Sequence, residues 1–75
     1  MTKEEFLSIQ PGEIVKLNLQ IHGLEGYSFG FVECVENHFG IHDATVTMFT
    51  PAKELFEGRW ELINRWNLDY WEIAK

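Results

Sequence analysis

The stretch YSFGFVECVE at residues 27–36 and the stretch IHDATVTMFT at residues 41–50 are the most strand-like parts of this chain. Both are rich in aromatic and β-branched residues, which favour strands. The short segment NHFG at 37–40 separates them and ends in a glycine, as hairpin turns often do. The pattern therefore predicts a β-hairpin. Gly30 lies between two phenylalanines and predicts a bend or bulge, which a small sheet needs in order to curl.

The apolar residues predict one register for this hairpin. Pairing residue 36 with residue 41 places Phe31 opposite Val46 and Phe29 opposite Met48. The apolar faces of both strands then lie on the same side of the sheet, and a slip of one residue would lose the match. We therefore expect Phe29 and Phe31 in the hydrophobic core.

The residues before the hairpin predict a short helix and a first strand. Thr2 and Glu5 have the spacing of a capping box, which predicts one or two helical turns to about Ser8, ended by Pro11-Gly12. Residues 13–21 alternate between apolar and polar, which predicts a strand with one buried face. Its apolar positions are Val15, Leu17, Leu19 and Ile21. A turn at 23–26 follows.

The residues after the hairpin have two interpretations. Thr50-Pro51 is a typical helix start. In the first interpretation a short helix over 51–57 ends at Gly58, a residue preferred just past a helix end, and strands near 59–63 and 70–74 follow, joined by a turn at 65–67. In the second, the apolar spacing continues one helix over 51–66. The first is favoured because Gly58 is well placed as a stop.

Five short antiparallel strands predict a mainly β fold, a small and strongly bent sheet or barrel with one or two short helices. The order is a PGEIVK opening strand at 11–16, a hairpin, a fourth strand, a tight turn and a last strand. This order resembles the layout of SH3-like barrels. The resemblance implies an architecture and no particular ligand. The alternative is an α+β fold, a three-stranded antiparallel meander packed by the helix at 51–66.

The 75 residues predict a single domain over 1–75. Hydrophobic residues make up 45% of the chain and aromatic residues 15%, enough for a real core. Cys34 is the only cysteine, so no disulfide framework exists. The first residues are charged and lack the apolar run of a signal peptide, and no stretch has the length of a membrane span. These features favour a cytoplasmic protein that does not associate with membranes.

The charge of the chain is explained most simply by solubility, and otherwise it indicates a protein partner. The formal net charge is −6, from twelve acidic and six basic residues. The basic residues are scattered along the sequence, so direct binding to nucleic acid is not expected. A partner protein with a basic surface suits this charge better.

The sequence contains no pattern that requires catalysis or a cofactor. It has no nucleophile elbow, no phosphate-binding loop and no H-E-x-x-H motif, so we expect neither an enzyme nor a bound cofactor. Cys34, His38 and His42 stand four residues apart, but a strand–turn–strand segment does not gather them, and no metal site is predicted. Glu33 and His42 are diagonal neighbours in the predicted register, which favours a plain polar pair at the open end of the sheet beyond the core. The alternative is a pH-sensitive or general acid–base pair.

The last third of the chain carries the predicted binding site. Trp60 continues the apolar pattern and is expected in the core. Adjacent residues of a strand or helix point in different directions, so either Tyr70 or Trp71 should reach the surface. Exposed aromatic residues beside acids would make a binding anchor with an acidic rim. The predicted protein-binding residues are Trp66, Asp69, Tyr70, Trp71 and Glu72.

Together these features predict a non-enzymatic protein-binding module. It would be a small acidic inhibitor or adaptor, of the kind found in phages and mobile elements, acting on a basic surface of a larger protein complex. One alternative is a structural subunit that hides the same surface in a homo-oligomer. The other is a small-ligand or metal-binding domain.

Overall fold

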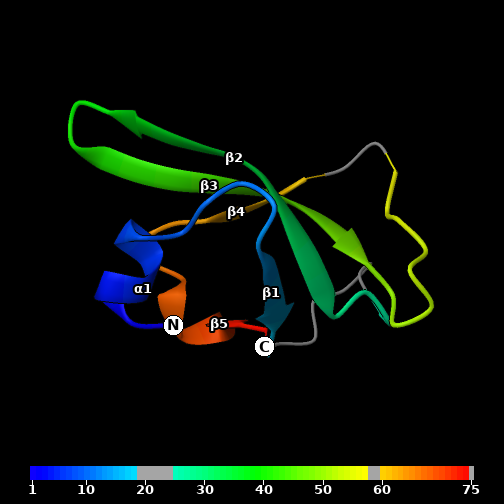
Figure 1. Cartoon of the computed structure of the whole chain (residues 1–75). Helices are drawn as coiled ribbons and strands as arrows, with labels where there is room; N and C mark the ends of the chain where they lie inside the picture. The colour runs from blue at the N-terminus through cyan, green and yellow to red at the C-terminus, as the bar shows by residue number, and fades with distance from the viewer. Residues whose placement is uncertain (19–24, 58–59, 75) are drawn as a thin grey trace.

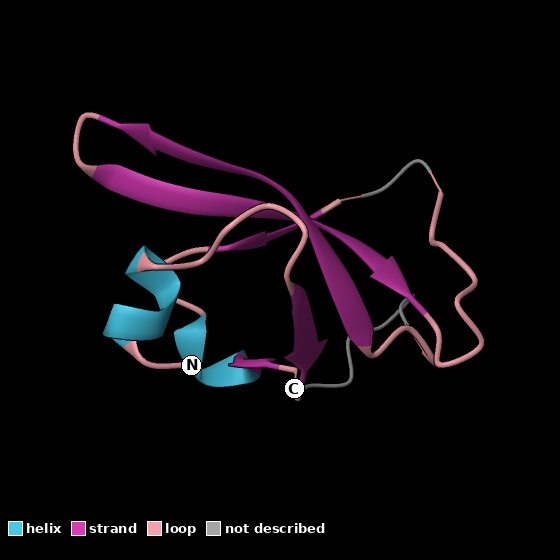
Figure 2. Ribbon diagram, viewed as in Figure 1, coloured by secondary structure: helices cyan, strands magenta, loops and turns pink. Residues whose placement is uncertain are grey.

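The fold is a single curled sheet of five antiparallel strands, seen in a computed structural model that describes residues 1–18, 25–57 and 60–74 (Figure 2). The elements are α1 (Lys3–Leu7), β1 (Ile14–Leu17), β2 (Phe29–His38), β3 (Ile41–Phe49), β4 (Glu61–Ile63), a 3₁₀ turn (Leu68–Tyr70) and β5 (Trp71–Ile73). The order across the sheet is β4-β3-β2-β1-β5. The prediction of a mainly β fold with five antiparallel strands is confirmed.

The hairpin of β2 and β3 is the longest feature of the fold, and its far end extends beyond the other strands (Figure 1). Pairing continues to His38 opposite Ile41, and a two-residue turn of Phe39 and Gly40 closes the hairpin. Both turn residues have positive φ, 53° and 81°, as the central residues of a type I′ hairpin turn require. The ladder shifts between Val32 and Cys34, and such a bulge bends a strand and increases its twist.

The predicted register of the hairpin is wrong, by one residue at Phe29–Val32 and by two residues between the bulge and the turn, where Glu36 pairs with Asp43. Phe31 pairs with Thr47, while Val46 pairs with Val32. A shift of one residue moves each side chain to the other face of the sheet. Phe31 therefore lies on the face opposite the core, and its side chain is 37% exposed.

The core fills the inner face of the curled sheet, between the strands and α1 (Figure 1). Apolar side chains come from all five strands, from α1 and from the segment that follows it. The buried residues are Phe6, Ile9, Val15, Leu17, Val32, Ala44, Val46, Met48, Ile63 and Trp71. Val15 and Leu17 are buried as the alternation predicted, whereas Leu19 and Ile21 lie outside the described residues.

The predicted capping box of α1 is confirmed. The amide of Glu5 donates to Thr2 Oγ1 at 3.1 Å, and the amide of Thr2 donates to Glu5 Oε1 at 2.8 Å. Phe6 packs edge-on against His42, with 4.8 Å between ring centroids. His42 Nε2 also lies 3.1 Å from the carbonyl oxygen of Phe6. These contacts hold the short helix against the hairpin.

The predicted helix over 51–57 is wrong, as is the longer helix over 51–66. Residues 51–52 form a turn, Leu55 bridges to Phe49, and β4 occupies 61–63. The physical reason is the edge of β3. Within the described residues β4 pairs with Ala44–Val46, so the backbone groups of the last residues of β3 need partners from another segment. The returning chain supplies partners for them, such as Phe56 N donating to Met48 O at 2.9 Å. Gly58, the predicted helix stop, lies outside the described residues.

Candidate binding site

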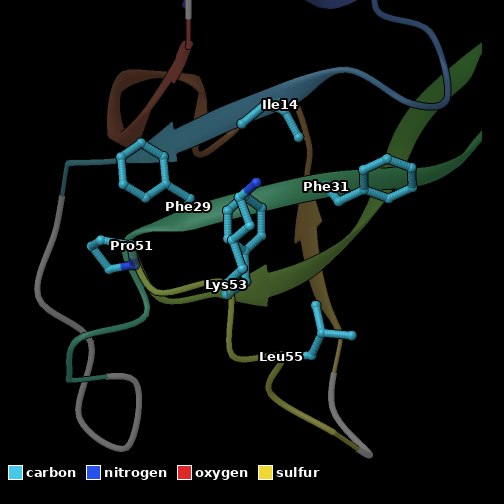
Figure 3. A pocket seen from close by; sticks show the side chains of 7 residues that line it. Ile14, Phe29, Phe31, Pro51, Lys53 and Leu55 are labelled. Atoms are coloured by element: carbon cyan, nitrogen blue, oxygen red, sulfur yellow. The ribbon is translucent and has the colours of Figure 1, made fainter.

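An apolar groove lies on the face of the sheet opposite the core. Alternation along the strands places Ile14 opposite Phe31 and Phe29 opposite Phe49 on this face. These side chains border an open cavity of about 680 Å³, which we call the aromatic groove (Figure 3). Its lining residues are Ile14, Phe29, Phe31, Phe49, Pro51, Lys53 and Leu55.

Aromatic rings form the floor of the aromatic groove. The rings of Phe29 and Phe49 stack with 5.8 Å between centroids and 21° between planes. Both side chains are half-buried, and Phe31 next to them is more exposed. Stacking between neighbours shields part of each ring but leaves apolar surface in contact with water. The groove therefore offers a preformed apolar surface to another molecule.

The returning segment 50–55 makes one wall of the aromatic groove. The amide of Thr50 donates to Glu54 O at 2.9 Å, and the amide of Lys53 donates to Thr50 O at 2.7 Å. Lys53 has a positive φ of 65°, and its side chain lies between Phe29 and Phe31 in Figure 3. Leu55 is exposed beyond it. This tight loop brings the one charged side chain of the lining over an apolar floor.

The lining of the aromatic groove suits binding. Ligand sites are commonly apolar cavities of about 300–1,000 Å³ with few polar groups. Six of the seven lining residues are apolar, and Lys53 is the only titratable one. Lys53 makes no ion pair within the described part of the chain. An occupant with an aromatic or aliphatic body and an acidic group nearby would match these features.

The residues of the predicted C-terminal binding site do not lie together in the structure. Trp71 is 2% exposed and belongs to the core, because it sits opposite Leu17 on the inner face of the sheet. Its neighbour Tyr70 is 46% exposed. The adjacent aromatic residues therefore point in different directions, as predicted, and Trp71 is not available as an anchor. Trp60, expected in the core, is 71% exposed, so that prediction is wrong.

The other predicted binding residues remain at the surface in two places. Asn64 and Asn67 shape a turn in which Asn64 Oδ1 accepts the Trp66 amide at 2.9 Å. Trp66 projects from this turn and carries the guanidinium of Arg65 over its ring at 4.4 Å. Asp69 is exposed nearby in the 3₁₀ turn. Glu72 lies elsewhere, opposite Lys16 on the same sheet face as the aromatic groove. Their roles in binding stay a prediction.

The predicted pair of Glu33 and His42 is wrong. Glu33 accepts a hydrogen bond from Thr47 Oγ1 at 2.9 Å on the groove face of the sheet. His42 contacts the carbonyl oxygen of Phe6 on the opposite face. The bulge in β2 and the changed register separate the two residues. His38 Nε2 lies 2.9 Å from Glu36 Oε2 on the exposed hairpin. Among the described residues, no three potential metal ligands come together.

Comparisons of this chain with protein-family models, curated proteins and solved structures found no match. Within the described residues, no helix has the length and apolarity needed to cross a membrane. Any functional conclusion therefore depends on the geometry of the chain itself.

Proposed function

We propose that this chain is a non-enzymatic protein-binding module whose aromatic groove receives an apolar side chain of a partner protein. One observation carries the proposal: Phe29, Phe31 and Phe49 gather on the face opposite the core, around an open cavity. Clustered apolar side chains in contact with water often mark interaction sites. The hydrophobic core is made of residues on the inner face and contains none of these three rings.

The energetics fit a single anchor. Removing one large apolar side chain from water stabilises a complex by roughly 1.5–3 kcal/mol. Aromatic pairs at favourable angles add about 0.5–1.5 kcal/mol beyond the area term. An aromatic partner residue seated among Phe29, Phe31 and Phe49 would gain both contributions. Such a residue has the properties of an interface hot spot.

The net charge of the chain supports a partner with a basic surface. Glu33 and Glu72 make an acidic rim on the sheet face of the aromatic rings, and the exposed Lys16, opposite Phe29 and Glu72, lies on the same face. The whole chain carries six net negative charges. An acidic rim speeds association with a basic partner and adds less to the final affinity. An inhibitor or adaptor that covers a basic site on a larger complex would use both the anchor and the rim.

Selection from a random peptide library displayed on phage tests this proposal without a known partner. The wild-type protein, Phe31→Ser and the matched control Leu7→Ser would be compared with the selected peptides. Leu7 is exposed on α1, which packs on the inner face of the sheet. The selected peptides should contain an aromatic or large aliphatic residue.

The two variants should respond differently. Phe31→Ser should weaken binding of the selected peptides by about 30-fold, equivalent to roughly 2 kcal/mol, while Leu7→Ser leaves the affinity unchanged. Selected peptides that bind wild type and Phe31→Ser equally well would show that the aromatic groove is not the binding site.

A further inference from the structure

The tip of the β2–β3 hairpin carries an aromatic side chain that does not pack against the rest of the protein. Phe39 is 104% exposed, and the next most exposed aromatic residues among those described reach 71%. The turn that contains Phe39 lies at the end of the hairpin that extends from the body of the protein (Figure 1). Phe39 therefore contributes nothing to the core, and its ring is fully available to another molecule.

The backbone at Phe39 makes this placement more unusual. Its φ of 53° lies in the left-handed region, where bulky residues are rare and Asn, Asp or Gly are the usual choices in such turns. Phenylalanine at this position serves neither the turn nor solubility. Strain of this kind together with full exposure points to a function for the side chain itself.

The surroundings of Phe39 complement the aromatic groove. Ile41 is exposed next to the turn, and Glu36 lies opposite Asp43 at the base of the tip. The neighbours of this aromatic group are therefore two acids and His38, whose Nε2 lies 2.9 Å from Glu36 Oε2. The aromatic groove has stacked rings on its floor and one cation, Lys53, which has no ion-pair partner within the described residues.

We infer that the aromatic groove of one copy of this chain receives Phe39 from a second copy, with Glu36 near Lys53. This inference rests on the proposed role of the groove as a binding site, and it adds a second copy of the chain as an occupant besides the basic partner protein. Phe39 suits the site better than Trp66, which is less exposed, at 71%, and has the Arg65 guanidinium over its ring at 4.4 Å. Ring-on-ring contacts with the groove floor would orient the incoming phenylalanine.

The contact joins two different surfaces, so it is heterologous and has a characteristic salt dependence. Each copy carries six net negative charges, and this repulsion outweighs a single attraction between Lys53 and Glu36. The Debye length falls from about 30 Å at 0.01 M salt to about 8 Å at 0.15 M. Association should therefore become stronger as salt rises over this range.

Sedimentation analysis with two complementary variants tests the contact. Phe39→Asn removes the tip but keeps the groove, and asparagine tolerates the backbone of the turn. Phe31→Ser removes part of the groove but keeps the tip. Wild type and the control Leu7→Ser should associate reversibly between about 10 µM and about 1 mM, a range that covers weak complexes. Each of the two variants alone should associate at least about tenfold more weakly.

The mixture of the two variants gives the sharpest result. An intact groove on Phe39→Asn and an intact tip on Phe31→Ser leave one productive contact, so the mixture should form a 1:1 dimer that grows no further. If Phe31→Ser does not fold, Leu55→Ser replaces it, since Leu55 lines the groove and is exposed.

Three results would overturn the inference: monomeric wild type throughout this range, self-association by Phe39→Asn equal to wild type, or a mixture that stays monomeric. The library peptides distinguish this failure from failure of the proposed function. If they still bind wild type and lose affinity for Phe31→Ser, the groove is a binding site whose occupant is another protein. If they do not, both proposals fail.

Discussion

A Cβ atom added to Gly30 would lie 2.1 Å from Cγ1 of Val46 and 3.2 Å from Sδ of Met48. The side chains of β3 occupy the space that a side chain on Gly30 would need. This close approach makes the Gly30 face of β2 the core face. Since neighbouring residues of a strand point to opposite sides, Phe29 and Phe31 are directed to the other face, where they form the aromatic groove.

Gly30→Ala should destabilise the protein. The added methyl group would displace Val46 from a close-packed core, and overpacking of this kind costs about 1–3 kcal/mol. Urea unfolding followed by circular dichroism measures the change. Ser28→Ala, just before β2, is the control and should stay within about 0.5 kcal/mol of wild type. A Gly30→Ala protein as stable as wild type would contradict the packing of β2 against β3.

Met48→Ala should destabilise the protein more than Phe31→Ala does, although phenylalanine is the larger side chain. Met48 is buried, and truncation of a buried methionine costs about 2–5 kcal/mol. Phe31 is partly exposed on the groove face, so its truncation removes less buried surface and should cost clearly less. Denaturant midpoints of the two variants give the ranking. A larger loss for Phe31→Ala would place that ring in the core after all.

Thr2→Ala should cost about 1 kcal/mol, the usual loss for a helix N-cap. The substitution leaves the amide of Glu5 without its acceptor, and α1 is too short to be stable without its end contacts. Chemical denaturation measures the loss, and Thr2→Ser, which keeps the hydroxyl, should restore most of it. Equal stability of all three proteins would mean that the capping box is not formed in solution.

The three tryptophans should report two different environments. A protein with Trp60→Phe and Trp66→Phe retains the buried Trp71, whose emission should be blue-shifted and poorly quenched by acrylamide. Trp71→Phe retains two tryptophans that are each 71% exposed, which should emit at longer wavelength and be quenched readily. Equal quenching of both proteins would contradict the placement of Trp71 in the core.

Local patterns predicted much of the fold. The capping box of Thr2 and Glu5, a turn within 37–40 and the alternation at Val15 and Leu17 each depend on residues close in sequence, although the observed turn is the shorter Phe39-Gly40. The pairing of β2 with β3 did not follow from such a pattern, because two registers match apolar residues almost equally well. Gly30 separates them, since its small size permits the close approach to Val46.

The candidate site was harder to predict for a related reason. Aromatic residues were assigned to the core at Phe29, Phe31 and Trp60, and all three lie on the surface or in the groove. Composition alone does not tell which aromatic residues a small core can hold. The segment 50–55 forms the groove wall only because β4 leaves the end of β3 unpaired, and that depends on long-range pairing.

The central claim is that the phenylalanine face of β2 is open to a partner while the adjacent residues form the core. Thiol labelling tests it most directly. In a Cys34→Ser background, a thiol is introduced by Phe31→Cys in one protein and by Val32→Cys in another. We predict rapid labelling at position 31 and labelling at least about 100-fold slower at position 32, where reaction requires opening of the core. Slow labelling at position 31 with rapid labelling at position 32 would contradict the account.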